Sequence, residues 1–176
     1  NNLSLSGEQL RMLEDIYDDF ANGAVNLSAE KKPIYRELKA KLSNLSLTYE
    51  QNVLKATNAW TKLLTEESLL VGVSKDVKKM LASNAEKKGL KGWLLDLKPT
   101  TYIPVMQYCE NRDIRRELYM AYNTRCIGGE FDNINLIKEI VNTRLAIVQL
   151  FDKMCYAEKS LRKTMAKTTE NVYNLL

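Results

Sequence analysis

Histidine is absent from the 176 residues of this chain. Histidine is the usual general base near neutral pH and a frequent zinc ligand. Its absence excludes a Ser-His-Asp triad, a Cys-His pair and a helical H-E-x-x-H zinc site within this sequence. Chemistry performed by this chain alone would therefore depend on carboxylates, lysine, tyrosine or cysteine.

Cysteine is scarce, and long apolar runs are missing. The three cysteines, Cys109, Cys126 and Cys155, are odd in number and far apart, and no C-x-x-C occurs. This disfavours a disulfide framework or a cysteine zinc site. Reduced thiols are typical of the cytoplasm, where we expect the protein. No apolar run approaches the roughly 20 residues that span a bilayer, so we expect no membrane partner.

The chain starts without methionine, at Asn1, and stops at Leu176 inside an expected helix. We therefore expect a piece of a longer protein, and the sequence leaves open whether a signal peptide precedes it.

Charge is weakly basic and unevenly distributed. The net charge is +4, with five acidic residues and one basic residue in 1–27, and fourteen basic and eight acidic residues in 28–98. The lysines are spread along expected helical faces, which favours a solvated surface. Only Arg112, Arg115 and Arg116 suggest a nucleic-acid groove, and we expect no nucleic-acid partner.

Seven glycines and three prolines are few for this length, which predicts a mainly α fold. Ser6 with Gln9 is a capping box that starts a helix ending near Ala21. The longest helix is predicted over about 28–58, because apolar residues recur there every three or four positions. This stripe is long enough to need partners along its full length, some of them outside the chain. It consists of Ile34, Leu38, Leu42, Leu45, Tyr49, Val53, Ala56 and Trp60.

Two short apolar runs, about 60–65 and 93–97, are predicted to pair as a two-stranded β ribbon, with a helix over 74–88 between them. A short helix is predicted near 105–109, after Pro99 and Pro104, and Asn111 is predicted to cap a helix over 111–125. Further helices are predicted near 134–151 and 157–165, and from 169 onward. Without an internal repeat, we treat 1–176 as a single helical segment.

Two clusters of polar residues can be interpreted either as ordinary surface or packing residues or as binding sites. Glu14, Asp15, Asp18 and Asp19 lack the spacing of a calcium loop, so we favour a solvated helix face. Arg115, Tyr119 and Tyr122 share one helical face, and Arg125 follows them. Tyrosine and arginine are frequent at binding surfaces but also in ordinary packing. We favour packing, and a ligand-facing role stays open.

Three runs of residues carry a resemblance to a known family. They are Asn52-Val53-Leu54-x-Ala56-Thr57-Asn58-Ala59-Trp60, then Gly89-Leu90-x-Gly92-Trp93-Leu94-Leu95 with Pro99-Thr100-x-Tyr102-x-Pro104-Val105-Met106, and last Asn111-Arg112-x-x-Arg115-Arg116-Glu117-Leu118-Tyr119-x-Ala121-Tyr122-x-Thr124-Arg125. In this order they resemble the thimet-oligopeptidase-like zinc metallopeptidases, most closely the bacterial peptidyl-dipeptidases (dipeptidyl carboxypeptidases) and oligopeptidase A. The resemblance extends over nearly the whole chain.

The resemblance implies an almost wholly helical protein in which a deep channel admits short peptides. It also implies a zinc site, a helical H-E-x-x-H with a further glutamate, located C-terminal to the matched region. This chain would then be a non-catalytic part of the channel wall, with no catalytic residue and no metal ligand of its own. Its partners would be the remainder of the parent polypeptide, which holds the zinc, and short peptide substrates. The residues that we expect on the channel wall are Arg115, Tyr119, Tyr122 and Arg125.

Two other functions stay open from the sequence. The chain could be a free-standing helical binding or adaptor module without enzymatic activity, using the Tyr/Arg helix face as its interface. It could also be a helical nucleic-acid-binding domain, which the charge pattern disfavours.

Overall fold

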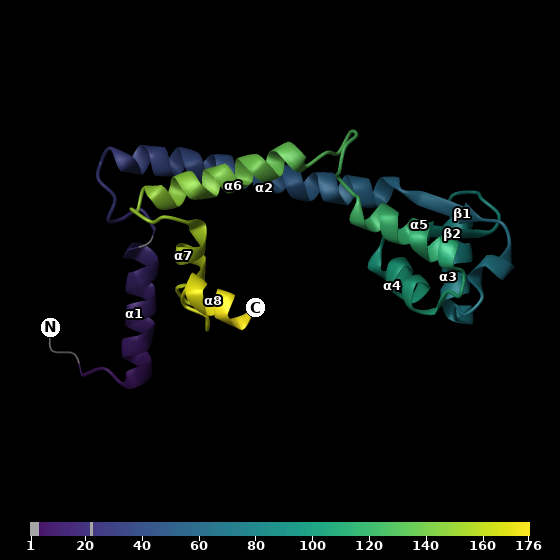
Figure 1. Cartoon of the computed structure of the whole chain (residues 1–176), viewed down its shortest axis with the longest axis horizontal. Helices are drawn as coiled ribbons and strands as arrows, with labels where there is room; N and C mark the ends of the chain where they lie inside the picture. Colours follow the sequence, from purple (N-terminus) through teal and green to yellow (C-terminus); the bar gives the residue numbers. More distant parts are fainter. Residues whose placement is uncertain (1–3, 22) are drawn as a thin grey trace. The chain divides into compact units, whose positions relative to one another are not determined.

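The computed structural model describes residues 4–21 and 23–176 and confirms a mainly helical fold. The described residues form eight α-helices, one short 3₁₀ helix and a two-stranded antiparallel sheet (Figure 1). The chain divides into two compact units. Unit 1 comprises Asn1–Ser46 and Lys138–Leu176, and unit 2 comprises Leu47–Ile137. The sequence prediction of one segment over 1–176 stays a prediction.

Local capping signals begin the first two helices. Helix α1 covers Gly7–Ala21. The Ser6 backbone N–H donates to Gln9 Oε1 at 3.0 Å, and the Gln9 N–H donates to Ser6 Oγ at 3.4 Å, which confirms the capping box. Helix α2 covers Lys31–Ala59 and confirms the long helix predicted over about 28–58. Pro33 is its third residue. The N–H groups of the first turn have no acceptor within the helix, so proline costs no intrahelical hydrogen bond there.

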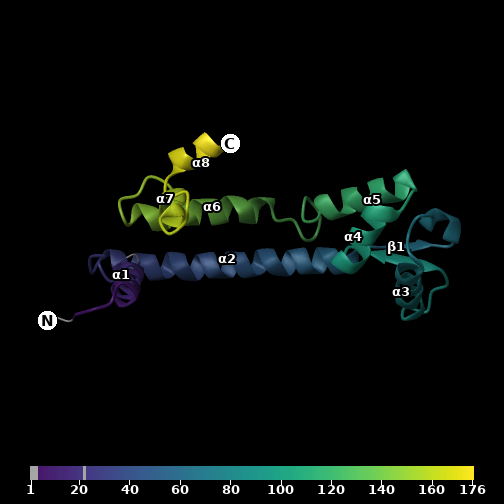
Figure 2. The ribbon, with the colours of Figure 1, turned by 90° about the horizontal axis from the view of Figure 1, so that it is seen from below.

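Helix α6 (Ile134–Gln149) belongs to unit 1 from Lys138 onward and runs antiparallel beside the first half of α2 (Figure 2). Lys31 Nζ donates to the Leu150 carbonyl oxygen at 3.1 Å, and the rings of Tyr35 and Phe151 meet edge to face at 5.7 Å. Further along, Lys41 Nζ lies 3.3 Å from Glu139 Oε2. Two shorter helices complete unit 1: α7 (Tyr156–Leu161) and α8 (Thr169–Leu175).

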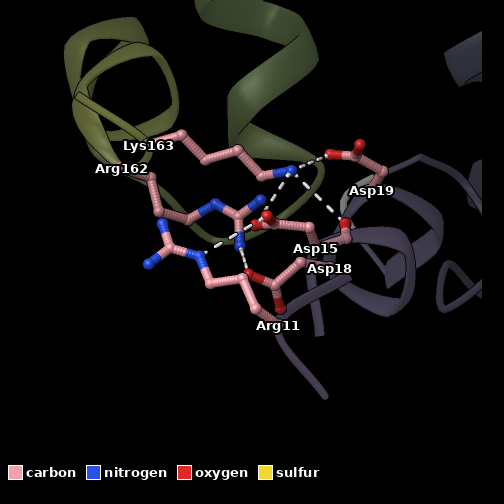
Figure 3. A network of polar contacts seen from close by, with 6 residues as sticks. All are labelled: Arg11, Asp15, Asp18, Asp19, Arg162 and Lys163. Atoms are coloured by element: carbon pink, nitrogen blue, oxygen red, sulfur yellow. Dashed lines mark hydrogen bonds and ion pairs between the residues drawn. The ribbon is translucent and has the colours of Figure 1, made fainter. Parts of the chain in front are cut away.

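The acidic face of α1 is exposed, as the solvated-face interpretation expects, and three of its aspartates also form ion pairs at the surface. Lys163 Nζ lies 2.6 Å from Asp19 Oδ1 and 3.8 Å from Asp15 Oδ1, and Arg162 binds Asp18 (Figure 3). Arg11 on the helix itself lies 3.7 Å from Asp15. Arg162 and Lys163 lie more than 140 positions from these aspartates in the sequence, so a local sequence pattern could not predict their pairing.

We expect Lys163→Gln to lower the stability of unit 1 slightly, by about 0.5 kcal/mol, because exposed ion pairs contribute little. The loss should be present at low salt and absent at high salt, since salt screens exposed charges. Thermal unfolding of the 176-residue chain at both ionic strengths tests this. Lys138→Gln, which removes an exposed lysine outside the network, is the matched control. Equal, salt-independent shifts for the two variants would contradict the network.

Unit 2 contains the predicted β ribbon. Strands β1 (Thr61–Leu64) and β2 (Trp93–Asp96) pair antiparallel, with Thr61 opposite Asp96 and Leu64 opposite Trp93. The 3₁₀ helix η1 (Glu67–Leu70) and helix α3 (Lys75–Glu86) lie between them in sequence. The predicted runs 60–65 and 93–97 are therefore confirmed as a ribbon.

Helix α4 (Pro99–Tyr108) begins six residues earlier than the short helix expected near 105–109. The two prolines misled the prediction, because they resemble breaks. Pro99 is the first helical residue, a position where proline is favoured. Pro104 lies inside the helix and leaves one backbone carbonyl without its usual N–H partner.

The main hydrophobic core lies in unit 2. Ten buried side chains from the ribbon, η1, helices α3 to α5 and the segments that connect them form it: Leu64, Leu70, Val73, Leu81, Leu95, Leu97, Val105, Cys109, Ile114 and Leu118. The Cys109 thiol lies 3.3 Å from the Leu69 carbonyl oxygen, to which it donates. All three cysteines are free, and Cys126 and Cys155 are only partly buried.

A buried amide fixes the chain where α6 begins. Asn133 is 1% exposed, and its Nδ2 donates to the Tyr49 carbonyl oxygen at 3.2 Å. Its Oδ1 accepts from Asn52 Nδ2 at 2.9 Å. Both contacts reach α2, so the side chain satisfies its polar atoms while joining distant parts of unit 2.

Several apolar helix faces are not covered by the described residues. Neither α1 nor α2 has a buried residue. On α6, Ile134, Ile137, Val141 and Leu145 share one face and are 37–56% exposed. Within residues 4–21 and 23–176, no helix combines the length and apolar character that crossing a bilayer would require.

Candidate functional site

Helix α5 (Arg112–Asn123) carries most of the residues that the sequence analysis singled out. Asn111 caps it as predicted, because its Oδ1 accepts from the backbone N–H groups of Asp113 and Ile114 at 3.0 and 3.2 Å. Ile114 and Leu118 are buried in the core of unit 2. One side of α5 is therefore anchored, and the remaining residues face outward or pack at the edge of the core.

Tyr122 lies in a stack of three side chains. Its ring packs on Tyr102 of α4 with centroids 4.1 Å apart and planes 25° from parallel. The Arg125 guanidinium carbon lies 3.8 Å from the Tyr122 ring centroid, a cation–π distance. Arg125 Nη1 also donates to Thr57 Oγ1 of α2 at 3.0 Å. The stack therefore connects α2, α4 and the end of α5 within unit 2.

Arg115 and Tyr119 differ in what they present to solvent. The Arg115 guanidinium is partly buried and donates from Nη1 to the Cys109 carbonyl oxygen, which follows α4. Tyr119 is 50% exposed. Of the four predicted wall residues, Arg115, Tyr122 and Arg125 thus make internal contacts, while Tyr119 offers a half-exposed ring. Their contact with a substrate stays a prediction.

An open groove along another side of α5 was not predicted from the sequence. Its volume is about 580 Å³, and it is lined among others by Trp60, Asp113, Arg116, Glu117, Met120 and Thr124. Lys62 of β1 pairs with Glu117 at this groove. None of the four predicted wall residues lines it. Most of the lining residues recur every three or four positions along α5, which places them on one side of the helix. Trp60 precedes them by more than 50 residues, so no local sequence pattern could predict that it lines the same groove.

The Cys126 thiol follows Arg125 and has a raised pKa. Burial raises it most, nearby Asp132 raises it further, and the Arg125 guanidinium offsets part of the effect. A raised pKa keeps the thiol protonated near neutral pH, which makes it a poor nucleophile. The structure therefore does not point to Cys126 as a reactive group.

The described residues do not fit a zinc ion. In residues 4–21 and 23–176, no three Cys, Asp or Glu side chains gather in a group able to hold a metal. Histidine, a frequent zinc ligand, is also missing from the sequence.

Comparison with known proteins supports the resemblance found in the sequence. The profile of Peptidase family M3 matches residues 105–176. Oligopeptidase A of Haemophilus influenzae is 37% identical over 173 residues, which cover 96% of this chain and 25% of that protein. This chain matches a segment of the peptidases of family M3. A probable cytosolic oligopeptidase A of Arabidopsis thaliana is 32% identical to this chain, over 98% of the chain and 26% of that protein. Dipeptidyl carboxypeptidase of Escherichia coli is 26% identical over 99% of the chain and 26% of its own length. The M3 segment thus spans about a quarter of the length of the curated relatives that it matches.

We expect Arg125→Ala to destabilise unit 2 by about 1–2 kcal/mol, because it removes a cation–π contact and a partly buried hydrogen bond together. Urea unfolding of the 176-residue chain, followed by tryptophan fluorescence, measures the loss. Arg112→Ala is the control, since Arg112 is an exposed arginine at the start of the same helix. If both variants unfold at the same urea concentration, the Tyr122 stack does not hold the end of α5.

Proposed function

We propose that this segment is a non-catalytic helical part of an M3 zinc peptidase that hydrolyses short peptides. The observation that carries the proposal is the co-linear similarity to oligopeptidase A over 96% of the chain, in a sequence without histidine. Zinc would be held by residues of the parent protein outside this chain. The contribution of the segment is steric: it forms wall surface that limits which peptides enter.

The uncovered helix faces support a partner in the remainder of the parent polypeptide. The Ile134, Ile137, Val141 and Leu145 face of α6 is apolar and largely exposed, as are Leu10, Leu13, Tyr17 and Phe20 on α1. Apolar faces of this size usually mark surfaces that another element covers. The relatives are about four times as long as the matched region, so they contain ample chain to cover both faces.

For the location we propose the cytoplasm. One plant relative is named as a probable cytosolic oligopeptidase A. Three free cysteines are consistent with a reducing compartment.

Tyr119 is the best candidate on α5 for direct contact with a peptide, because its ring is half exposed. Arg115, Tyr122 and Arg125 position this part of the wall through their internal contacts. Since contact with one wall residue matters only to a peptide long enough to reach it, the effect of a substitution should depend on peptide length.

The test uses the parent enzyme with Tyr119→Ala and a ladder of peptides of increasing length. We expect kcat/KM to fall several-fold for long peptides and to stay unchanged for the shortest. Tyr108→Ala, which removes another exposed tyrosine, is the matched control. Unchanged kinetics at every length for variants at all four positions would overturn the wall assignment. A native gene product of only 20.2 kDa that lacks zinc would instead favour the adaptor module.

A further inference from the structure

Lysine side chains gather around one small hollow of unit 2, away from the α5 groove. Its volume is about 240 Å³, and it lies among the ends of α2 and α3 and the β ribbon. Lys87, Lys88 and Lys98 line it together with Asn58, Asn84 and Asp96. Three lysines and one aspartate contribute to the lining, so its formal charge is positive.

The single carboxylate already has partners within the chain. Asp96 Oδ1 accepts from the Lys98 backbone N–H at 3.2 Å, and Oδ2 lies 4.0 Å from Lys98 Nζ. Lys87 and Lys88 form no ion pair with any residue in the part of the chain that the structure describes. Two positive charges therefore remain uncompensated at the hollow.

Backbone geometry fixes where these charges stand. Lys87 and Lys88 continue from the last turn of α3, with N–H groups that donate to Ser83 and Ala85 carbonyl oxygens at 3.0 and 2.9 Å. Gly89 then turns the chain with φ +69. Lys98 follows β2 directly and begins α4. The lysines come from the ends of helices and strands, and Asn58 and Asn84, which also line the hollow, carry side-chain amides that can donate hydrogen bonds.

We propose that this hollow binds a compact oxyanion, either the carboxylate of an acidic peptide side chain or inorganic phosphate. Ammonium groups and side-chain amides are donors that oxyanions accept, and charge-assisted hydrogen bonds are the stronger kind. A concave lining of one charge sign also concentrates the opposite ion. The proposal uses none of the four wall residues and stands independently of the peptidase assignment.

The experiment titrates the 176-residue chain with three probes: inorganic phosphate, a blocked glutamate (N-acetyl-glutamate amide) and its neutral glutamine analogue. Side-chain amide NMR signals of Asn58 and Asn84 report binding. We expect saturable shifts with phosphate, with the glutamate, or with both, and none with the glutamine analogue. Phosphate alone identifies phosphate as the source, and glutamate alone identifies a peptide carboxylate. Equal shifts with glutamate and glutamine, or no saturable shift at all, would overturn the proposal.

Variants distinguish specific binding in the hollow from nonspecific attraction to the positive surface. Lys87→Gln with Lys88→Gln should weaken binding about tenfold or more, since two charge-assisted contacts are lost. Lys75→Gln with Lys79→Gln lowers the net charge equally at a different hollow and should change binding less than about twofold at moderate salt. Asn84→Asp, a near-isosteric change that adds a carboxylate, should abolish binding. Equal weakening by the two double variants, or full binding by Asn84→Asp, would show that the hollow is not the site.

Discussion

Gly72→Ala is expected to destabilise unit 2 by at least about 3 kcal/mol. Gly72 has φ +87, a conformation that costs an L-residue about 1–2 kcal/mol. A Cβ at this position would also lie 2.0 Å from the Tyr108 carbonyl oxygen and 3.1 Å from Glu110 Cγ. The carbonyl has little room to move, because α4 ends there and the Glu110 N–H donates to the Val71 carbonyl oxygen at 2.8 Å.

Gly89→Ala is the matched control for this experiment. Gly89 also has a positive φ, +69, but beyond its chain neighbours no atom lies within 4 Å of the position that an added Cβ would take. It should therefore lose only the conformational term of about 1–2 kcal/mol. Urea unfolding followed by fluorescence compares the two, since Trp60 and Trp93, the two tryptophans of the chain, both belong to unit 2. Equal losses would mean that Gly72 and the Tyr108 carbonyl group at the end of α4 do not approach each other as described.

Leu118→Ala should be the most damaging change on α5, with a loss of about 2–5 kcal/mol. Leu118 is fully buried, and its side chain lies in the core with residues from the ribbon, η1, α3 and α4. Truncation removes buried methyl groups and leaves a cavity that rigid neighbours fill poorly. Because the same helix carries Tyr119 and the groove residues, α5 should also lose amide protection from hydrogen exchange.

Leu54→Ala provides the comparison for Leu118. Leu54 lies in the part of α2 that belongs to unit 2 and is 62% exposed. Its truncation should change the free energy of unfolding by no more than about 0.5 kcal/mol. If the two leucine variants unfold at the same urea concentration, α5 does not pack into the core through Leu118.

The predictions that succeeded rest on interactions between near neighbours. The capping box of Ser6 and Gln9 and the cap at Asn111 involve residues two or three positions apart, so sequence spacing alone determines them. The long helix follows from one uninterrupted apolar period. The prediction for α4 was wrong at its start, because the sequence analysis places this helix after Pro104, whereas Pro99 is its first residue.

The candidate site was only partly predictable, because long side chains and distant partners decide it. Periodicity placed Arg115, Tyr119 and Tyr122 on one face of α5. It could not show that Arg115 reaches back to the Cys109 carbonyl oxygen or that Arg125 reaches Thr57 on α2. The α5 groove is likewise completed by Trp60. The hollow proposed to bind an oxyanion is lined by residues at the ends of α2 and α3 and by the ribbon, which lie far apart in the sequence.

The unequal burial of the three cysteines makes the chain its own reporter of opening motions. Alkylating reagents attack the thiolate, so Cys126, with its raised pKa, should be modified slowly even when it is accessible. Cys109 is enclosed in the unit 2 core, and its alkylation requires that core to open. Cys155 belongs to unit 1 and is only partly covered. The alkylation rates of Cys109 and Cys155, measured by mass spectrometry, therefore report local opening of unit 2 and of unit 1 separately. No cysteine has to be introduced for this measurement.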